Sequence, residues 1–183
     1  MNLFGVLSEV YPTLLTGLTM TVKITILSLI IALVIGIFVC LMNISSNIVL
    51  RGIAKFYIWL IRGTPMLVQA FYFYFALPQL VQAVTGSQFR ITVFTASLVT
   101  LALNAGAYIS EIFRGSIESV NKGQMEAGRS LGLNKFQTMR YIIIPQAFKS
   151  ILPPLGNEFI VLIKETSIVV SYTHLRAHET VLD

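Results

Sequence analysis

The sequence has little charge. Only 11% of its 183 residues are Asp, Glu, Lys or Arg, and 55% are hydrophobic. Ordinary soluble domains carry roughly 25% charged residues, which they need to cover their surface. The mean hydropathy of +0.78 points the same way. The composition therefore argues against a cytosolic enzyme, a nucleic-acid-binding domain or a disordered tail, and it favours an all-α membrane protein.

Residues that commonly carry chemistry are also scarce. The single cysteine, Cys40, lies in an apolar run and excludes a disulfide within the chain. His174 and His178 are too few for a convincing zinc site. The sole aspartate, Asp183, leaves no paired aspartates, and no GxxxxGK[ST] occurs that could bind ATP phosphates. We therefore expect no catalytic residues, no metal site and no bound cofactor.

Four stretches are candidates for membrane-spanning helices. Three of them are uncharged and supply the roughly 20 residues that such a helix needs, namely 24–50, 63–89 and 91–110. The fourth, 150–172, contains Glu158, Lys164 and Glu165 and is therefore expected to be kinked or partly lined by protein. The chain is predicted to be a polytopic helix bundle with four spans.

Basic residues set the predicted orientation. Nine lie in the segments 42–62 and 111–149, whereas 1–12 has none and the connection between the second and third spans has only Arg90. This bias places both basic segments in the cytoplasm and the N-terminus outside. Within the first segment, Lys55, Trp59 and Arg62 share one helical face, which predicts a short interfacial helix before the turn at 63–65.

The cytoplasmic segment 121–145 predicts two short helices with a break between them. Residues 124–131 are mostly good helix formers, and Gly132 follows where a left-handed cap is expected. Asn134 and Gln137 have the spacing of a capping box, and Pro145 is expected to limit the second helix. A small helix held away from the bilayer in this way suits insertion into a groove on another protein.

The spacing of this segment resembles a known signature. Glu126-Ala127-Gly128, then Gly132 and the stretch 142–145, is similar to the EAA motif of the membrane subunits of binding-protein-dependent ABC importers. Gly128 and Ile144 depart from its commonest letters, alanine and leucine. Further stretches resemble the polar amino-acid branch of that family, namely 62–65, 74–78, 104–111 and 152–158. The resemblance covers about 14–170.

The resemblance implies a type I importer permease that carries a polar amino acid in the bacterial cytoplasmic (inner) membrane. Its coupling segment, about 112–148, would dock on a cytoplasmic ATPase subunit, and that partner rather than this chain would bind ATP. Other implied partners are an external amino-acid-binding protein, a second permease copy and membrane lipid, with no nucleic acid. The residues implied in docking are Gln124, Glu126, Ala127, Gly128, Ser130 and Gly132.

Polar side chains inside the spans allow two interpretations. Ser97, Thr100, Asn104, Tyr108 and Glu111 share one helix face, which should look into the bundle or at water. They are candidates for a wall of the solute path, or for packing and hydrogen bonds between helices. Glu111 has Arg114 as an alternative partner. The fourth span adds two candidate path residues, Asn157 and Lys164.

The tail 171–183 is polar, whereas the family is expected to continue with a final membrane helix. We therefore expect a truncated permease whose last residues are not native. This leaves a rival of another class, a transport-incompetent membrane anchor or regulator that still docks an ATPase. A membrane-embedded enzyme is a third reading, and the scarcity of catalytic residue types argues against it.

Overall fold

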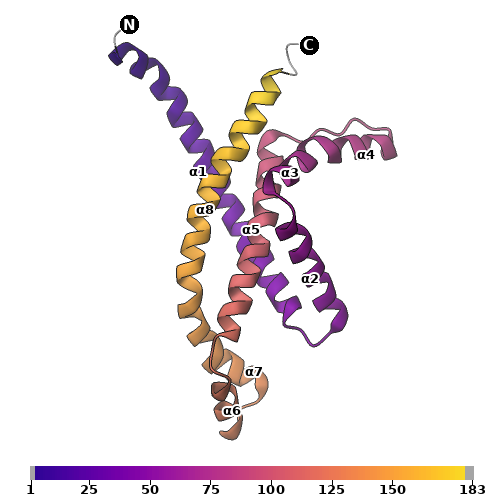
Figure 1. The fold of residues 1–183 in the computed structure, drawn as a ribbon, viewed down its shortest axis with the longest axis vertical. Coiled ribbons are helices and arrows are strands. Elements are labelled where there is room, and N and C mark those ends of the chain that lie inside the picture. Colours follow the sequence, from indigo (N-terminus) through magenta and orange to yellow (C-terminus); the bar gives the residue numbers. More distant parts are fainter. Residues whose placement is uncertain (1–2, 180–183) are drawn as a thin grey trace.

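The computed structural model describes residues 3–179, and over that range every regular element is a helix (Figure 1). The elements are α1 (Leu3–Asn43), α2 (Ile48–Gly63), α3 (Met66–Phe71), η1 (Tyr72–Ala76), α4 (Leu77–Thr85), α5 (Val93–Glu118), α6 (Lys122–Ser130), α7 (Lys135–Thr138), η2 (Met139–Ile143) and α8 (Ile144–Glu179). The segments η1 and η2 are π-helical. The predicted all-α fold is confirmed.

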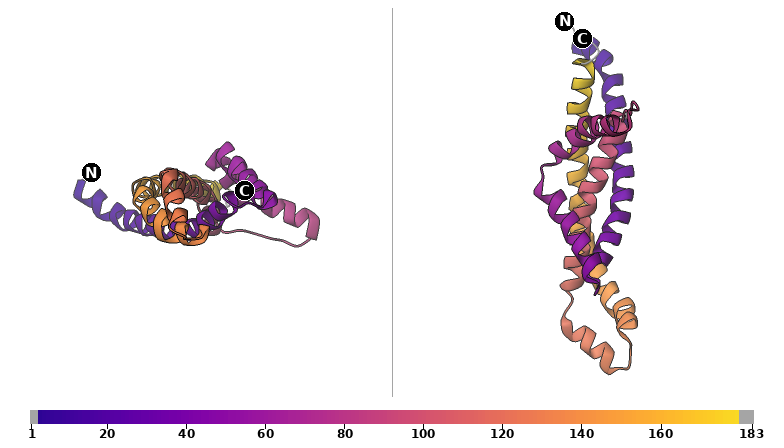
Figure 2. Two further views of the ribbon diagram at one scale, coloured as in Figure 1. Left: turned by 90° about the horizontal axis from the view of Figure 1, so that it is seen from below. Right: turned by 90° about the vertical axis from the view of Figure 1, so that its right-hand side faces the viewer.

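The long helices form an elongated bundle. Figures 1 and 2 show α1, α5 and α8 running lengthwise beside one another, with α2 packed against α1 and α5. The short helices α6 and α7 protrude from one end of this bundle, and the start of α1 and the end of α8 lie at the other. The cytoplasmic segment predicted from the sequence is therefore spatially separate from the bundle.

Glycines allow α1 and α5 to approach closely. A Cβ atom at Gly36 of α1 would lie 2.6 Å from Cγ2 of Ile109, and one at Gly106 of α5 would lie 2.8 Å from Cγ2 of Ile35. Each glycine thus receives an isoleucine of the opposite helix. The buried core around this contact includes Ile24, Ala32, Leu101, Ala105 and Leu162. Small residues at helix interfaces permit such packing in membranes, where lipid supplies no hydrophobic drive for helix association.

The helix expected before the second predicted span packs along the bundle. The expected interfacial helix is α2, which rises along the bundle beside α5, whereas α4 leans away from it at the far end (Figure 1). Tyr57 fixes α2 to α5 by donating a hydrogen bond to the carbonyl oxygen of Leu103 at 2.6 Å. The turn before Pro65 lies between α2 and α3, two helices that both contact α5. A residue before proline favours extended backbone, and Thr64 adopts that conformation here.

Three helical segments of the described chain are long and apolar enough to cross a membrane: Leu14–Asn43, Met66–Thr85 and Val93–Glu118. They correspond to the first three predicted spans. The fourth predicted span lies in α8, which carries Glu158, Lys164 and Glu165. Pro153 and Pro154 lie inside α8 without ending it.

Gln69 satisfies the backbone at the break between α2 and α3. Its Nε2 lies 2.7 Å from the carbonyl oxygen of Ile61 and 3.0 Å from that of Thr64, and its Oε1 accepts a hydrogen bond from Asn104 at 3.2 Å. The side chain is 7% exposed. Non-helical backbone at membrane depth is tolerated only where its polar groups find partners, and Gln69 provides them here.

Replacing Gln69 with leucine should lower the thermal unfolding midpoint of the purified chain in mild detergent. The variant removes the hydrogen-bond partner of the Ile61 and Thr64 carbonyl groups and of the Asn104 amide. A buried polar group that is left unsatisfied costs about 1–3 kcal/mol. Gln79→Leu is the matched control, because Gln79 is exposed. Equal midpoints for the two variants would contradict this role of Gln69.

Candidate functional site

The protruding segment has the local structure that its sequence predicts. Asn121 caps α6 by accepting a hydrogen bond from the Gly123 amide at 2.8 Å. Gly132 follows α6 with φ of +85°, a left-handed conformation that favours glycine. Asn134 and Gln137 form a capping box at α7, with reciprocal distances of 2.8 and 2.9 Å. These contacts fix the angle between α6 and α7.

Most of the predicted docking residues are exposed on this segment. They are Gln124, Glu126, Ala127, Ser130 and Gly132. Two apolar side chains join them, because Leu131 is 80% exposed and Phe136 is 71% exposed. Apolar side chains that project from a capped loop beyond the bundle are suited to a protein partner.

Gly128 differs from the other predicted docking residues because it is buried. A Cβ atom there would lie 2.6 Å from Cγ2 of Thr138 and 3.1 Å from Cδ1 of Ile142. Its close approach is therefore to α7 and η2 of the same chain rather than to an exposed surface. This contact also accounts for glycine where alanine is the usual letter of the motif.

Pro145 does not end the second short helix, contrary to the prediction. The chain passes from α7 through η2 directly into α8, and the amide of Ile144 donates to the carbonyl oxygen of Met139. Pro145 is the second residue of α8 and follows the π-helical turn, and the helix continues through it. Gln146 of α8 also reaches back to Gln124 of α6, with Nε2 3.3 Å from Oε1. The segment is thus continuous with α8.

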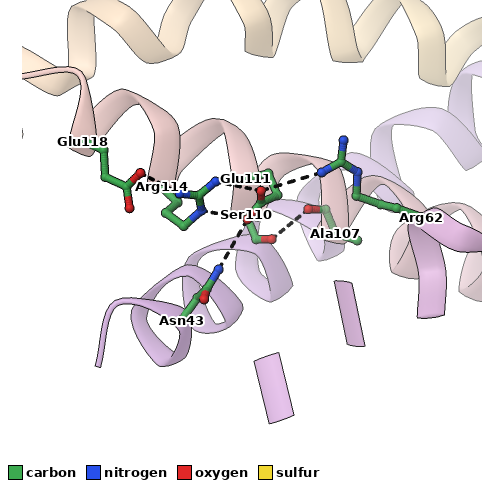
Figure 3. Close-up of polar contacts among 7 residues, drawn as sticks. All are labelled: Asn43, Arg62, Ala107, Ser110, Glu111, Arg114 and Glu118. Carbon is green, nitrogen blue, oxygen red and sulfur yellow. Dashed lines mark hydrogen bonds and ion pairs between the residues drawn. The ribbon is translucent and has the colours of Figure 1, made fainter. Parts of the chain in front are cut away.

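Glu111 joins three helices near the same end of the bundle (Figure 3). Arg114 binds its carboxylate through two nitrogens, each at 2.9 Å. Asn43 of α1 donates to Oε1 at 3.3 Å, and Arg62 of α2 lies 3.7 Å from Oε2. Charge-assisted and bidentate contacts of this kind are stronger than neutral hydrogen bonds. The structural alternative for Glu111, a partnership with Arg114, is confirmed.

The other predicted path residues do not gather on one surface. Thr100 is fully buried and donates to the carbonyl oxygen of Ala96 at 2.7 Å, and Asn104 is 5% exposed. Their burial supports the packing interpretation. Tyr108 is 38% exposed and carries the Arg62 guanidinium 5.0 Å from its ring centroid.

On α8, both Asn157 and Lys164 are exposed. The described residues show no ion pair between Lys164 and Glu165, which are neighbours in α8. A role in the solute path stays a prediction for these α8 side chains.

Sequence reasoning missed Gln69, Asn43 and the pairing of Arg62 with Glu111. A signal for Gln69 was available, because an amide in an uncharged span needs a partner. No comparable signal existed for Asn43, which lies 68 residues from Glu111 in the chain.

Apolar helices, polar contacts between them and a protruding capped segment are typical of a polytopic membrane component. The chain belongs to the family of binding-protein-dependent transport system inner membrane components, whose model matches residues 32–174. It is therefore a multi-pass permease component of an ABC importer and not an enzyme, since ATP hydrolysis belongs to a separate subunit in this family.

Curated relatives cover most of the chain. The glutamine transport system permease protein GlnP of Escherichia coli K12 is 43% identical over 159 residues, which are 87% of this chain and 70% of the relative. The probable amino-acid permease protein YxeN of Bacillus subtilis 168 is 41% identical over 158 residues, which are 86% of this chain and 69% of the relative.

Solved structures agree with the family assignment. A chain in the crystal structure of an amino acid ABC transporter with histidines matches with a TM-score of 0.85 and 44% identity, covering 94% of this chain and 77% of that one. A chain of the MetNI methionine ABC transporter, in an inward-facing conformation, matches with a TM-score of 0.67 at 20% identity, covering 85% of this chain and 72% of that one. The second match supports the fold alone.

Glu111→Gln should destabilise the purified chain, because the variant weakens contacts to α1, α2 and Arg114 together. We expect a loss of about 1.5–3 kcal/mol, the range for hydrogen bonds to charged groups. The measurement is the midpoint of unfolding in a mixed-detergent titration. Glu118→Gln is the control, because the Glu118 side chain is 59% exposed and pairs only with Arg114 among the described residues. A control as unstable as the test variant would refute the joining role of Glu111.

Gly128→Ala should loosen the protruding segment, because the added methyl group meets Thr138. Hydrogen exchange of residues 122–143 should accelerate severalfold, and adding Thr138→Ala should restore much of the protection by removing the clashing atoms. Gly115→Ala is the control, since a Cβ atom there meets nothing within 4 Å. Unchanged exchange in Gly128→Ala would show that the segment accommodates a methyl group.

Proposed function

We propose that the chain forms one half of an ATP-driven path for a polar amino acid across a bacterial cytoplasmic membrane. The observation that carries this proposal is the 43% identity to a glutamine permease over 87% of the chain. The likeness to an amino acid ABC transporter structure also supports it. Which amino acid is carried depends largely on a separate binding protein, so the proposal names the class.

The protruding segment is the proposed docking site for the ATPase subunit. Leu131 and Phe136 offer exposed apolar contacts, and Glu126 offers a carboxylate beside them. The partner subunit binds ATP in this proposal, and its closure moves α6 as a rigid body. The continuous connection from α7 through η2 to α8 carries that movement into the bundle.

The orientation follows from charge. Basic residues gather at the end of the bundle that bears α6 and α7, namely Lys122, Arg129, Lys135, Arg140 and Lys149. This end is the proposed cytoplasmic side, with the N-terminus outside. The opposite end would meet the amino-acid-binding protein, and a second permease copy, identical or similar, would complete the path.

The rival function is that of an anchor or regulator that docks an ATPase and moves no solute. The exposed docking segment is common to both functions and cannot separate them. Solute transport separates them, because only the permease couples hydrolysis to uptake.

Gly132→Pro should abolish capture of the ATPase. In the experiment, the tagged chain is coexpressed with the ATPase encoded beside it and purified in mild detergent. Proline fixes φ near −65° and cannot adopt the +85° of Gly132, so the turn that presents α6 is lost. Gly132→Asn is the matched control, because asparagine tolerates the left-handed region, and it should retain most of the capture.

Capture by Gly132→Pro at the level of the parent would refute the docking assignment. If the parent captures the ATPase, the same complex is placed in ATP-loaded proteoliposomes with the binding protein and labelled glutamine, arginine or histidine outside. ATP-dependent accumulation of any of them supports the permease. Captured ATPase without uptake would favour the anchor.

A further inference from the structure

A cavity of about 820 Å³ lies where α2 meets the ends of α1 and α5 and the α7–η2 segment. One of its walls is a face of α2 that carries Arg51, Lys55 and Trp59. Lys135 and Met139 of the protruding segment also line the cavity. This cavity is separate from the exposed surface of α6 and from the buried contacts of Gln69.

The charges in this cavity are unbalanced. Its two carboxylates, on Glu111 and Glu118, are both occupied by Arg114 at 2.9 and 2.6 Å. Among the described residues, Arg51, Lys55 and Lys135 form no ion pair. Three lysine or arginine side chains thus line one cavity without an acidic partner, which favours an anionic ligand.

The same cavity has an apolar side. Ile44, Ile58 and Met139 contribute to its lining beside Trp59. Trp59 is 69% exposed, and its ring centroid lies 5.9 Å from that of Phe56, which is 61% exposed. Tryptophan is enriched where the hydrocarbon of a membrane meets its headgroups. A ligand for this cavity would therefore be both anionic and amphiphilic.

We propose that the cavity binds the headgroup of an anionic phospholipid from the cytoplasmic leaflet. The phosphate lies among Arg51, Lys55 and Lys135, and the glycerol and acyl region lies against Trp59. Basic cavities between membrane helices on the cytoplasmic side bind such headgroups. The proposal rests on the proposed function for its orientation. A bound lipid would bridge α2 and α7 and so brace the segment that docks the ATPase.

The choice of a lipid over an acidic protein surface rests on the exposed apolar face of α2. Ile48 is 76% exposed and Leu60 is 43% exposed, in addition to the two aromatic residues beside the cavity. An acyl chain covers such side chains in the bilayer, whereas an acidic peptide would leave them uncovered. Metal binding is a poor alternative, because cations repel one another and no cluster of three or more potential metal ligands exists among the described residues.

Native mass spectrometry of the whole chain, released from mild detergent, tests the proposal. The probes are phosphatidylglycerol, phosphatidylcholine with the same acyl chains, and soluble glycerol 1-phosphate. The test variant combines Arg51→Gln, Lys55→Gln and Lys135→Gln. The control combines Arg129→Gln, Arg140→Gln and Lys149→Gln, which removes the same charge from exposed sites that do not line the cavity.

We expect the parent to bind phosphatidylglycerol at least tenfold more tightly than phosphatidylcholine. The control variant should keep this preference and the test variant should lose it, while both keep the helical circular dichroism of the parent. If the triple variant fails to fold, Lys135→Glu alone should reduce the preference at least threefold. Lys149→Glu is its control.

Several outcomes would overturn the proposal. Equal affinity of the parent for the two lipids would show that the cavity does not select an anionic headgroup. An equal loss of the lipid preference in the test and control triple variants would show that the preference comes from general surface charge. Glycerol 1-phosphate binding as tightly as the lipid assigns the cavity to a free phosphate. Displacement of the lipid by the purified ATPase subunit assigns it to a protein. A parent chain that shows no lipid preference but still captures the ATPase refutes this inference alone, whereas a parent chain that shows the preference but captures no ATPase refutes the proposed function.

Discussion

The structure depends on the close packing of α1 against α5. Gly36 and Gly106 each admit an isoleucine of the other helix, so the two backbones approach more closely than larger residues would permit. In lipid, this contact replaces the hydrophobic drive that associates helices in water, because lipid chains are as apolar as the side chains. The pair then provides the surface on which α2 and α8 pack (Figure 1).

Several polar groups inside this frame are satisfied between helices. Gln69 serves the break after α2 and reaches Asn104 on α5, while Thr25 of α1 donates to Thr166 of α8 at 3.1 Å. At the end of the bundle near α6, Glu111 collects contacts from α1, α2 and α5. These contacts specify register, since each polar group has its partner in one arrangement only. The bundle is thus packed through its glycines and aligned through its polar pairs.

Local features of the structure were predictable from the sequence. The turn at Gly132 and the capping box at Asn134 depend on neighbouring residues, and both have the predicted geometry. Apolar length was enough to find three spans. What could not be predicted depends on residues distant in sequence. To predict the contact of Gly128 with Thr138, one must know the angle between α6 and α7. To predict the path of α2, one must know that Tyr57 forms a hydrogen bond with α5.

The same limit explains the uneven outcome for the predicted path face. Periodicity correctly grouped Thr100, Asn104 and Glu111 on one side of α5, yet periodicity carries no information about what covers that side. The structure covers Asn104 with Gln69 and Glu111 with arginines from two helices. The polar face of α5 therefore indicated where helices meet. Only the residues that contact this face distinguish a helix interface from the wall of a solute path.

The protruding segment combines an exposed partner surface with a stiff connection to the bundle. Gly128 locks α6 against α7, and η2 joins α7 to α8 without an intervening loop. A flexible linker would absorb a displacement of α6, whereas packed elements that lack free space transmit it. The π-helical turn η2 keeps this connection hydrogen-bonded, because the amide of Ile144 donates to the carbonyl oxygen of Met139. Displacement of α6 should therefore pass through α7 and η2 to α8 rather than bend α6 away from the chain.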